Sequence, residues 1–266
     1  MNSRNLIIAM AIHYQGDVLA ITQALLNKEF IDEAQAETYL KSIKCNVLTI
    51  LDKEYPCYLK EIRYPPIVLF YYGDISLLSD VEKNLAVVGS RKASEEGRKN
   101  VYYIVSNACK RYNIVSGLAK GIDTIAHKAA IDNGGRTIAV LANGIEYCYP
   151  SCNSELYKEI KKKHLVISEY YGYVSPEQIH FHQRNRLIAG LAKGTLIGEA
   201  SRISGTLITA NYTLEIFRQL MVIPNGDIKN SLNDLLIKEG APVVTEPQDV
   251  IDYLSERRNS LLCEVK

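Results

Sequence analysis

No apolar run in this sequence of 266 residues approaches the ~18 residues that a membrane-spanning helix needs. The apolar stretch 6–12 follows Arg4 and resembles the core of a signal peptide, with a cleavage-like motif at residues 9–11. A cut there would leave almost no apolar core before it, so we favour a first buried helix. The sequence therefore predicts a cytoplasmic protein with no membrane association.

Disulfide and metal signatures are also missing. The six cysteines are scattered and form no Cys-x-x-Cys pair, which favours reduced thiols in a cytosolic chain. Cys148 and Cys152, together with His180 and His182, are the one combination that could bind zinc. Because no second cysteine pair supports that site, we expect ordinary half-buried thiols and no metal.

Nucleotide-binding fingerprints are absent as well. The sequence has no GxxxxGK[ST] motif and no GxGxxG motif, and only a GxxxG spacing joins Gly117 to Gly121. Internal repeats and low-complexity tracts are not found either. A P-loop enzyme is therefore excluded, NAD binding has little support, and we expect no cofactor.

Candidate catalytic groups are few. Asp123 and His127 stand four residues apart on one predicted helix and could pair, but no serine or cysteine lies beside them in the sequence. We favour a structural or ligand-orienting role for them over a catalytic dyad. Glu146, Glu169 and Glu199 are well separated, and their spacing does not pair them for acid–base chemistry. The sequence predicts no catalytic residue.

Charge is unevenly distributed along the chain. The formal net charge is +1, yet residues 1–83 carry −3, residues 84–230 carry +7 and residues 231–266 carry −3. A basic centre between acidic flanks favours a polyanionic partner, which the overall charge conceals. The alternative is a solvated helix face, as expected for the three lysines at 161–163.

The apolar pattern predicts two kinds of structure. Hydrophobic residues make up 47% and charged residues 23%, as in a globular protein with one α/β domain and a small appendage. Spacings of three and four predict helices over 6–26 and 31–43. From residue 84, short apolar runs alternate with helical stretches, which is typical of a parallel sheet covered on both faces.

We therefore predict a doubly wound Rossmann-like α/β fold with a small N-terminal helical domain. The domains are a helical unit at 1–55, an extended Rossmann-like domain at 56–245, and a C-terminal helix and tail at 246–266. The expected strands are 67–72, 85–88, 114–115, 137–141, 165–167, 195–197, 220–223 and 242–244. The expected helices after residue 84 are 95–111, 124–133, 154–163, 186–191, 207–219, 232–238 and 248–257.

Glycine and serine recur where the predicted strands end. Such loops let a ligand approach the backbone, and they precede helix N-termini that favour anions. In a doubly wound sheet these loops lie at one edge and together would form a phosphate-binding rim, although each alone could be an ordinary turn. The loops contain Gly89-Ser90-Arg91, Ser116 to Asp123, Asn143-Gly144 and Ser204-Gly205-Thr206.

The triplet Arg184-Asn185-Arg186 follows His180-Phe181-His182 at the start of a predicted helix. Guanidinium groups bind phosphate through two parallel hydrogen bonds and stack on bases. With Arg91 and Arg202, the two arginines would line the same edge of the sheet. The alternative is that they pair within the chain with Glu169 or Glu199.

Six distinctive sequence blocks follow one another along the chain after an entry segment, YPCYLKEIRYPPIVLFYYGD (55–74). The blocks are AVVGSRKASEEGR (86–98), IVSGLAKGIDTIAHKAAI (114–131), TIAVLANGIEYCYPSCNSEL (137–156), ISEY (167–170), FHQRNRLIAGLAKG (181–194) and EASRISGTLITA (199–210). Together, over about residues 55–245, they closely resemble the DprA/Smf family, the DNA-processing proteins of natural transformation.

The resemblance implies a homodimeric protein that binds and protects single-stranded DNA and loads a RecA-type recombinase onto it, without enzymatic turnover. The positions that match the family's DNA-facing motifs are Ser90, Arg91, Ser116, Gly117, Lys120, Asn153, Arg184, Arg186, Ser204, Gly205 and Thr206. The N-terminal helices resemble a small helical domain of some members.

Two other functions use the same rim. The superfamily includes nucleotide phosphoribohydrolases of the LOG type, but here the stretch 202–209 lacks their PGG glycines and has Thr209 in place of the glutamate. A small-nucleotide sensor is the other alternative, and the sequence does not separate it from a DNA-binding protein.

The predicted dimer interface lies in the tail. Leu232, Leu235, Leu236 and Glu239 follow helical spacing at a sheet edge that no later domain covers, and exposed apolar edges are usually paired. The alternative is that these leucines pack against the chain's own sheet.

Overall fold

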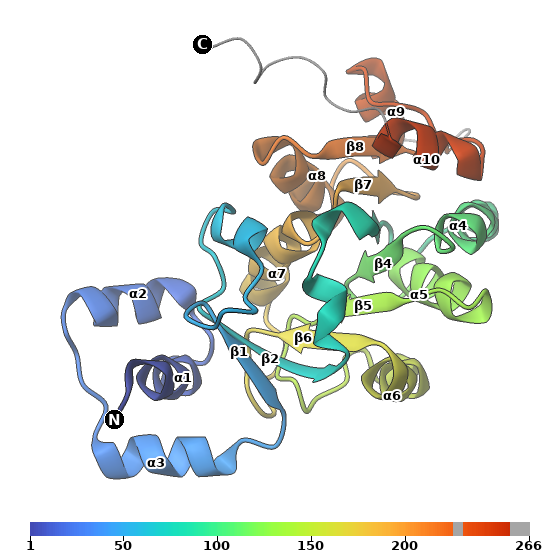
Figure 1. Ribbon diagram of the computed structural model, residues 1–266. Coiled ribbons are helices and arrows are strands. Elements are labelled where there is room, and N and C mark those ends of the chain that lie inside the picture. Colours follow the sequence, from blue (N-terminus) through green and yellow to red (C-terminus); the bar gives the residue numbers. More distant parts are fainter. Residues whose placement is uncertain (226–230, 256–266) are drawn as a thin grey trace.

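The computed structural model describes residues 1–225 and 231–255 (Figure 1). It is built around one sheet of eight strands in the order β1-β2-β6-β5-β4-β3-β7-β8. The strands are β1 (Asn46–Thr49), β2 (Val68–Gly73), β3 (Asn84–Val88), β4 (Asn113–Ser116), β5 (Thr137–Val140), β6 (Leu165–Ser168), β7 (Gly194–Ile197) and β8 (Gln219–Val222).

The doubly wound α/β fold predicted from the sequence is confirmed. The chain starts the parallel part at β3, winds outward through β4, β5 and β6, and then crosses back to add β7 and β8 on the other side of β3. The parallel sheet predicted from residue 84 onward is observed, and β1 and β2 extend it as antiparallel strands beside β6. The point where the winding reverses lies between β3 and β7, where ligands of such folds usually bind.

Helices cover both faces of the sheet (Figure 1). The helices of these layers are α4 (Glu95–Ala108), α5 (Ile122–Asp132), α6 (Ser154–Lys163), α7 (Gln178–Gly190), α8 (Gly205–Glu215), α9 (Leu232–Lys238) and α10 (Pro247–Ser255). Alternate residues of β3 face opposite layers: Leu85 and Val87 pack with α4, α5 and α10, whereas Ala86 and Val88 pack with α7, α8 and α9.

Most predicted boundaries differ from the structure by a few residues, and three elements need comment. Helix α7 begins at Gln178, eight residues before the predicted start, so the whole His-Phe-His segment is helical. The predicted strand 242–244 is reduced to a single bridge between Val222 and Val243. The predicted last helix ran to residue 257, and its final two residues lie outside the described part of the chain.

The first of the N-terminal helices packs directly on the sheet, and the other two pack against it. These N-terminal helices are α1 (Ser3–His13), α2 (Val18–Leu26) and α3 (Glu33–Ser42), blue in Figure 1. Ile8 and Met10 of α1 join one hydrophobic cluster with Phe70 of β2 and Val166 of β6. Strand β1 lies before the predicted domain boundary at residue 55 and is nevertheless part of the sheet. None of the helices within the described ranges is long and apolar enough to cross a bilayer.

Helix α9 corrects the argument for a dimer interface in the tail. Leu232 and Leu236 are 0% and 5% exposed and belong to the core beneath β8, and Leu235 is half-buried against the same core. Of the four predicted interface residues, Glu239 is the exposed one. The helix covers the sheet edge itself, so Leu232 and Leu236 are core residues of the monomer, and dimerisation through the remaining surface of α9 stays a prediction.

We therefore predict that Leu236→Ala lowers the free energy of unfolding by about 2–5 kcal/mol, the usual cost of a large-to-small change in a core. Glu239→Ala, one turn further along the helix, should change it by less than about 0.5 kcal/mol. Urea denaturation at two protein concentrations measures both. A small effect of Leu236→Ala would contradict a core role for this leucine, and a concentration dependence of the midpoint that the substitution abolishes would show that it contacts another copy.

Candidate nucleic-acid interface

A polar pocket of about 730 Å³ lies at the point where the winding of the sheet reverses. The loops after β3, β4 and β7 form its floor, and α7 and α8 form its walls. Its lining residues are Val88, Gly89, Ser90, Arg91, Lys92, Ala119, Asp123, Gln178, Phe181, His182, Arg184, Asn185, Ile188, Ser201, Ser204, Gly205, Thr206 and Thr209.

Buried side chains and hydrogen bonds hold the loop after β4 in one conformation. Leu118 has a φ of 57°, in the left-handed region that few leucines adopt, and its fully buried side chain anchors the turn in the core. The Asp123 carboxylate accepts hydrogen bonds from the backbone N–H of Gly117 and Ala119, at 3.1 and 3.3 Å. The side-chain amide of Asn153 donates to the Leu118 carbonyl at 2.9 Å. The exposed end of this loop is therefore rigid.

The loop after β3 is tied to its neighbours in the same way. The Ser90 carbonyl accepts a hydrogen bond from the N–H of Ile122, and a Cβ at Gly121 would stand 2.1 Å from that carbonyl oxygen. The carboxylate of Glu199 accepts hydrogen bonds from both the N–H and the hydroxyl of Ser94, which caps α4. Glu199 is thus occupied in holding the loop.

Arg91 projects from this loop into the pocket rim. Its guanidinium lies 4.6 Å from the ring centroid of Phe181, a cation–π contact. Within the described residues, neither Arg91 nor the adjacent Lys92 has a side-chain hydrogen bond or an ion pair, and both are exposed. These two cations remain available to a ligand.

Arg184 lines the pocket but is only 4% exposed. Its guanidinium donates to the carbonyls of Gly117, at 2.7 Å, and Val140, at 2.5 Å, and so joins the ends of β4 and β5. Burial lowers the pKa of Arg184 to about 10, and the nearby Asp123 charge opposes this shift. Burial likewise raises the pKa of Asp123, against the effect of Arg184 and the backbone N–H groups.

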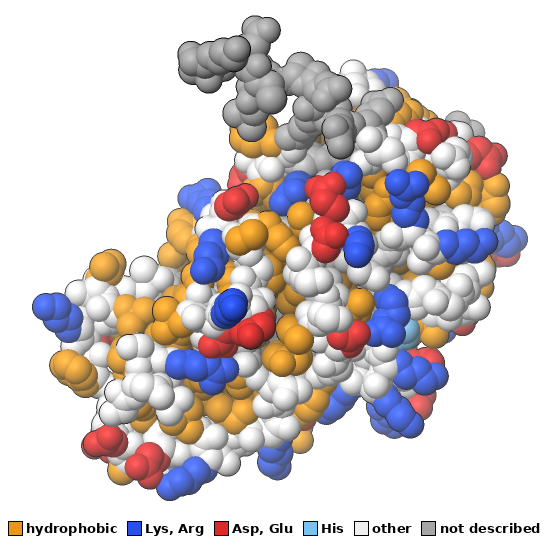
Figure 2. All heavy atoms as spheres, viewed as in Figure 1, with side chains coloured by type: hydrophobic (Ala, Val, Ile, Leu, Met, Phe, Trp, Pro, Cys, Tyr) orange, Lys and Arg blue, Asp and Glu red, His pale blue; other side chains and the backbone are white. Residues whose placement is uncertain are grey.

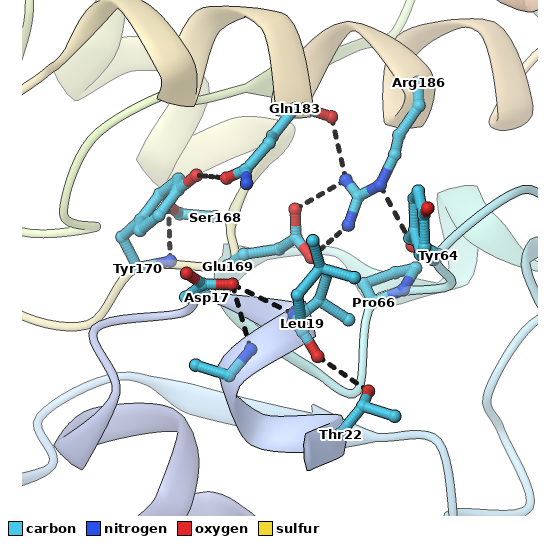
Figure 3. Close-up of polar contacts among 12 residues, drawn as sticks. Asp17, Leu19, Thr22, Tyr64, Pro66, Ser168, Glu169, Tyr170, Gln183 and Arg186 are labelled. Carbon is cyan, nitrogen blue, oxygen red and sulfur yellow. Dashed lines mark hydrogen bonds and ion pairs between the residues drawn. The ribbon is translucent and has the colours of Figure 1, made fainter. Parts of the chain in front are cut away.

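Arg186 is not among the residues that line the pocket and is paired within the chain (Figure 3). Its guanidinium forms two hydrogen bonds to the Glu169 carboxylate, at 2.7 and 2.6 Å, and both side chains are buried. It also donates to the carbonyls of Tyr64 and Gln183. The intramolecular pairing with Glu169, the alternative weighed from the sequence, is therefore observed.

The predicted site residues fall into two groups. Six of them line the pocket, and Lys120 is exposed beside Ala119, which lines it. Ser116, Asn153 and Arg186 lie inside the fold and bond to backbone or side chains there, and Gly117 offers its carbonyl to Arg184. The six in the pocket are Ser90, Arg91, Arg184, Ser204, Gly205 and Thr206.

Sequence reasoning missed several lining residues on α7. Gln178, Phe181 and His182 face the pocket because the helix begins earlier than predicted. The segment was noticed in the sequence, but without the helix its register, and so the direction of Phe181, was not apparent. Lys92 was missed although it follows Arg91 directly.

Part of the positive charge in the centre of the chain is paired with neighbouring carboxylates. In the view of Figure 2, positive and negative side chains lie side by side over the molecule. Lys158, Lys163 and Lys99 pair with glutamates one turn away. The excess positive charge that remains near the pocket comes from Arg91, Lys92, Lys120 and Arg184.

The candidate catalytic and metal groupings are dispersed. Asp123 bonds to backbone, whereas Nδ1 of His127 lies 2.6 Å from the hydroxyl of Thr137, so the two do not pair. Glu146 bonds to the hydroxyl of Tyr72 and contacts Lys161. Across residues 1–225 and 231–255, no three His, Cys, Asp or Glu side chains are grouped to hold a metal ion.

Fold and site together define a Rossmann-like α/β protein with a polar, partly cationic pocket at the carboxyl edge of its sheet. The family model of DNA recombination-mediator protein A matches residues 46–255. The chain belongs to this DprA family, whose members act in DNA processing and recombination, as the sequence blocks indicated.

Curated relatives and solved structures agree with this assignment. The chain is 46% identical over 206 residues to the DNA processing protein DprA of Streptococcus pneumoniae, covering 76% of this chain and 72% of the relative. The X-ray structure of the S. pneumoniae protein gives a TM-score of 0.79 at 40% identity, over 88% of this chain and 81% of that one. The Helicobacter pylori protein, studied for its single-stranded DNA binding mode, gives a TM-score of 0.69 at 28% identity, over 80% and 96% of the two chains.

The buried ion pair gives a first prediction for the site. Glu169→Gln leaves Arg186 charged and buried without its partner, so it should lower the free energy of unfolding by about 3–5 kcal/mol. The double variant Arg186→Met with Glu169→Leu should recover much of that loss. Urea denaturation of the three proteins measures it, and equal stability of Glu169→Gln and wild type would show that the pair contributes nothing.

His127 gives a prediction about pH. The Thr137 hydroxyl donates to the Ile114 carbonyl, so Nδ1 of His127 carries the proton, and burial lowers the pKa of His127 to about 3. Between that pH and the pKa of about 6.5 in the unfolded chain, the imidazole is protonated in the unfolded state but neutral in the folded state. Lowering the pH through this range therefore decreases the free energy of unfolding by up to about 1.4 kcal/mol per pH unit.

His127→Asn removes this titration. Its stability deficit relative to wild type, measured by urea denaturation, should therefore shrink as the pH falls from 7 to 4.5. A deficit that stays constant over this range would contradict a neutral buried histidine.

Proposed function

We propose that the pocket binds single-stranded DNA through its phosphates. The observation that carries this proposal is the pair of exposed, unpaired cations, Arg91 and Lys92, on a rigid rim of glycine and serine loops. The N-terminus of α8 at Gly205 opens into the same pocket and favours an anion there. The relative from H. pylori, studied for its mode of binding single-stranded DNA, supports the same ligand.

The shape of the site favours one strand over a duplex. A cavity of about 730 Å³ has the size of a small-ligand site, which admits a few unstacked nucleotides but not a paired helix. Phe181 sits at the wall, where a base could stack on its ring, and stacking of this kind tolerates any sequence. We therefore expect little sequence preference and weaker binding of double-stranded DNA.

Family resemblance extends the proposal beyond the pocket. By analogy, the protein protects single-stranded DNA that enters during natural transformation and loads a RecA-type recombinase onto it, acting as a homodimer in the cytoplasm. The support for these steps is membership of the DprA family, not a surface of this chain. Ser116, Gly117, Asn153 and Arg186 contribute to binding by holding the loops and helix that form the pocket.

We infer that the protein binds DNA without turnover. The carboxylates nearest the pocket, Asp123 and Glu199, accept hydrogen bonds from the loops that they hold, and Thr209 stands where the LOG-type hydrolases have a glutamate. A nucleotide sensor would use the same phosphate contacts. Competition by a nucleoside monophosphate, with analysis of the products, distinguishes a sensor or a hydrolase from a DNA-binding protein.

Arg91→Ala should weaken binding of single-stranded DNA without changing stability. Loss of one charge-assisted contact is worth about 1.5–3 kcal/mol, and the slope of log K against log salt should become less negative by about 0.7. Fluorescence anisotropy with a labelled oligonucleotide measures both quantities.

Arg111→Ala provides the matched control. Arg111 is also exposed and precedes β4, so it lies at the opposite edge of the sheet from the pocket. This variant should bind like wild type. If both variants lose affinity equally, the binding reflects net charge alone; if Arg91→Ala has no effect, the pocket is not the DNA site.

A further inference from the structure

Three exposed tyrosines lie on the loops after β5 and β6 and belong to none of the hydrophobic core clusters of the described residues. Tyr147, Tyr149 and Tyr173 are 38%, 37% and 77% exposed. The ring of Tyr149 stands 6.0 Å from the ring of Phe181, which lines the pocket, at an angle of 56°. The aromatic surface of the pocket wall therefore continues outward onto the loop after β5.

Backbone hydrogen bonds hold these tyrosines on two interlocked loops. The N–H of Gly144 donates to the Val174 carbonyl at 2.8 Å, and the N–H of Glu146 donates to the Gly172 carbonyl at 2.9 Å. A Cβ at Gly144 would stand 2.2 Å from the Gly172 oxygen, so only glycine permits this approach. The bonds place residue 173 of one loop beside residues 144–146 of the other.

The chemistry of this surface suits bases better than phosphates. The carboxylate of Glu146 contacts the Tyr72 hydroxyl and Lys161, so it would not repel a DNA strand that lies over the tyrosines. Exposed aromatic rings on a rigid backbone lose little freedom when a flat ligand stacks on them. Nucleobases are flat and, in a single strand, unpaired.

We propose that Tyr147, Tyr149 and Tyr173 form a base-stacking track along which single-stranded DNA continues out of the pocket over the loops after β5 and β6. This inference rests on the proposed function of the pocket and adds the direction in which the strand leaves it. The track binds bases, so its contribution to affinity depends little on salt. It also makes the affinity depend on strand length.

The test compares DNA ligands of different length and composition. The double variant Tyr147→Ala with Tyr173→Ala is titrated with an oligonucleotide of about four nucleotides, with one of about 16, and with a strand of the longer length that lacks bases. Stacking is worth roughly 5- to 150-fold in affinity per base. We expect the variant to lose about tenfold or more on the long oligonucleotide and to bind the short and abasic strands like wild type.

Two sets of controls isolate the aromatic ring. Tyr147→Phe with Tyr173→Phe keeps both rings and should retain wild-type affinity for the long strand. Tyr102→Ala with Tyr103→Ala removes two exposed tyrosines from α4, on another surface, and should also bind normally. Urea denaturation and sedimentation of each variant check folding and oligomeric state.

The possible failures are distinguishable. If the track variant binds the long oligonucleotide normally while Arg91→Ala weakens every strand, the track is wrong and the pocket stands. An equal loss on the abasic strand overturns base stacking, and a change in oligomeric state with unchanged DNA binding assigns the tyrosines to a protein contact. If Arg91→Ala has no effect on any strand, the proposed function itself fails.

Discussion

The pocket depends on the buried guanidinium of Arg184. It donates hydrogen bonds to the carbonyls of Gly117 and Val140. Its positive charge also stabilises the buried carboxylate of Asp123, which accepts a hydrogen bond from the backbone N–H of Gly117. Burying a charge is expensive unless polar partners surround it. Here the partners are the ends of two parallel strands, where carbonyls lack a continuing ladder. One residue of α7 thus fixes the position of the helix against the sheet and the shape of the loop after β4.

A division of labour among arginines follows from this arrangement. Arg184 and Arg186 are buried, and their several N–H groups donate hydrogen bonds to backbone carbonyls and to a carboxylate. Arg91 remains on the surface, held over Phe181 by a contact that leaves its N–H groups in solvent. A rigid rim matters for a flexible ligand, because ordering the ligand already costs entropy and the protein adds none. Interior arginines therefore support binding without touching the ligand.

The sequence predicted the parallel strands well because each is a short, nearly continuous apolar run that both helix layers bury. It missed β1, a four-residue edge strand that runs from exposed Asn46 to buried Thr49 and pairs with β2 alone, so its short apolar stretch was not recognised as part of the sheet. It also placed Arg186 at the rim, since a triplet of polar residues at a helix start looks exposed. In fact every residue of α7 from Arg184 to Gly190 is buried, and the local sequence contains no pattern that predicts this burial.

The same limit applies to the tail and to the aromatic loops. Leu232 and Leu236 read equally well as an exposed edge or as a core, and only the position of α9 over β8 decides for the core. Conversely, exposed tyrosines at 147, 149 and 173 become meaningful only when two distant loops are seen to interlock. The spacing of apolar residues predicts that a residue will be buried. Contacts between segments far apart in the sequence determine which surface buries it. For a binding site assembled from five loops, the ligand's path is therefore a property of the tertiary structure, and the motif residues mark only where that path begins.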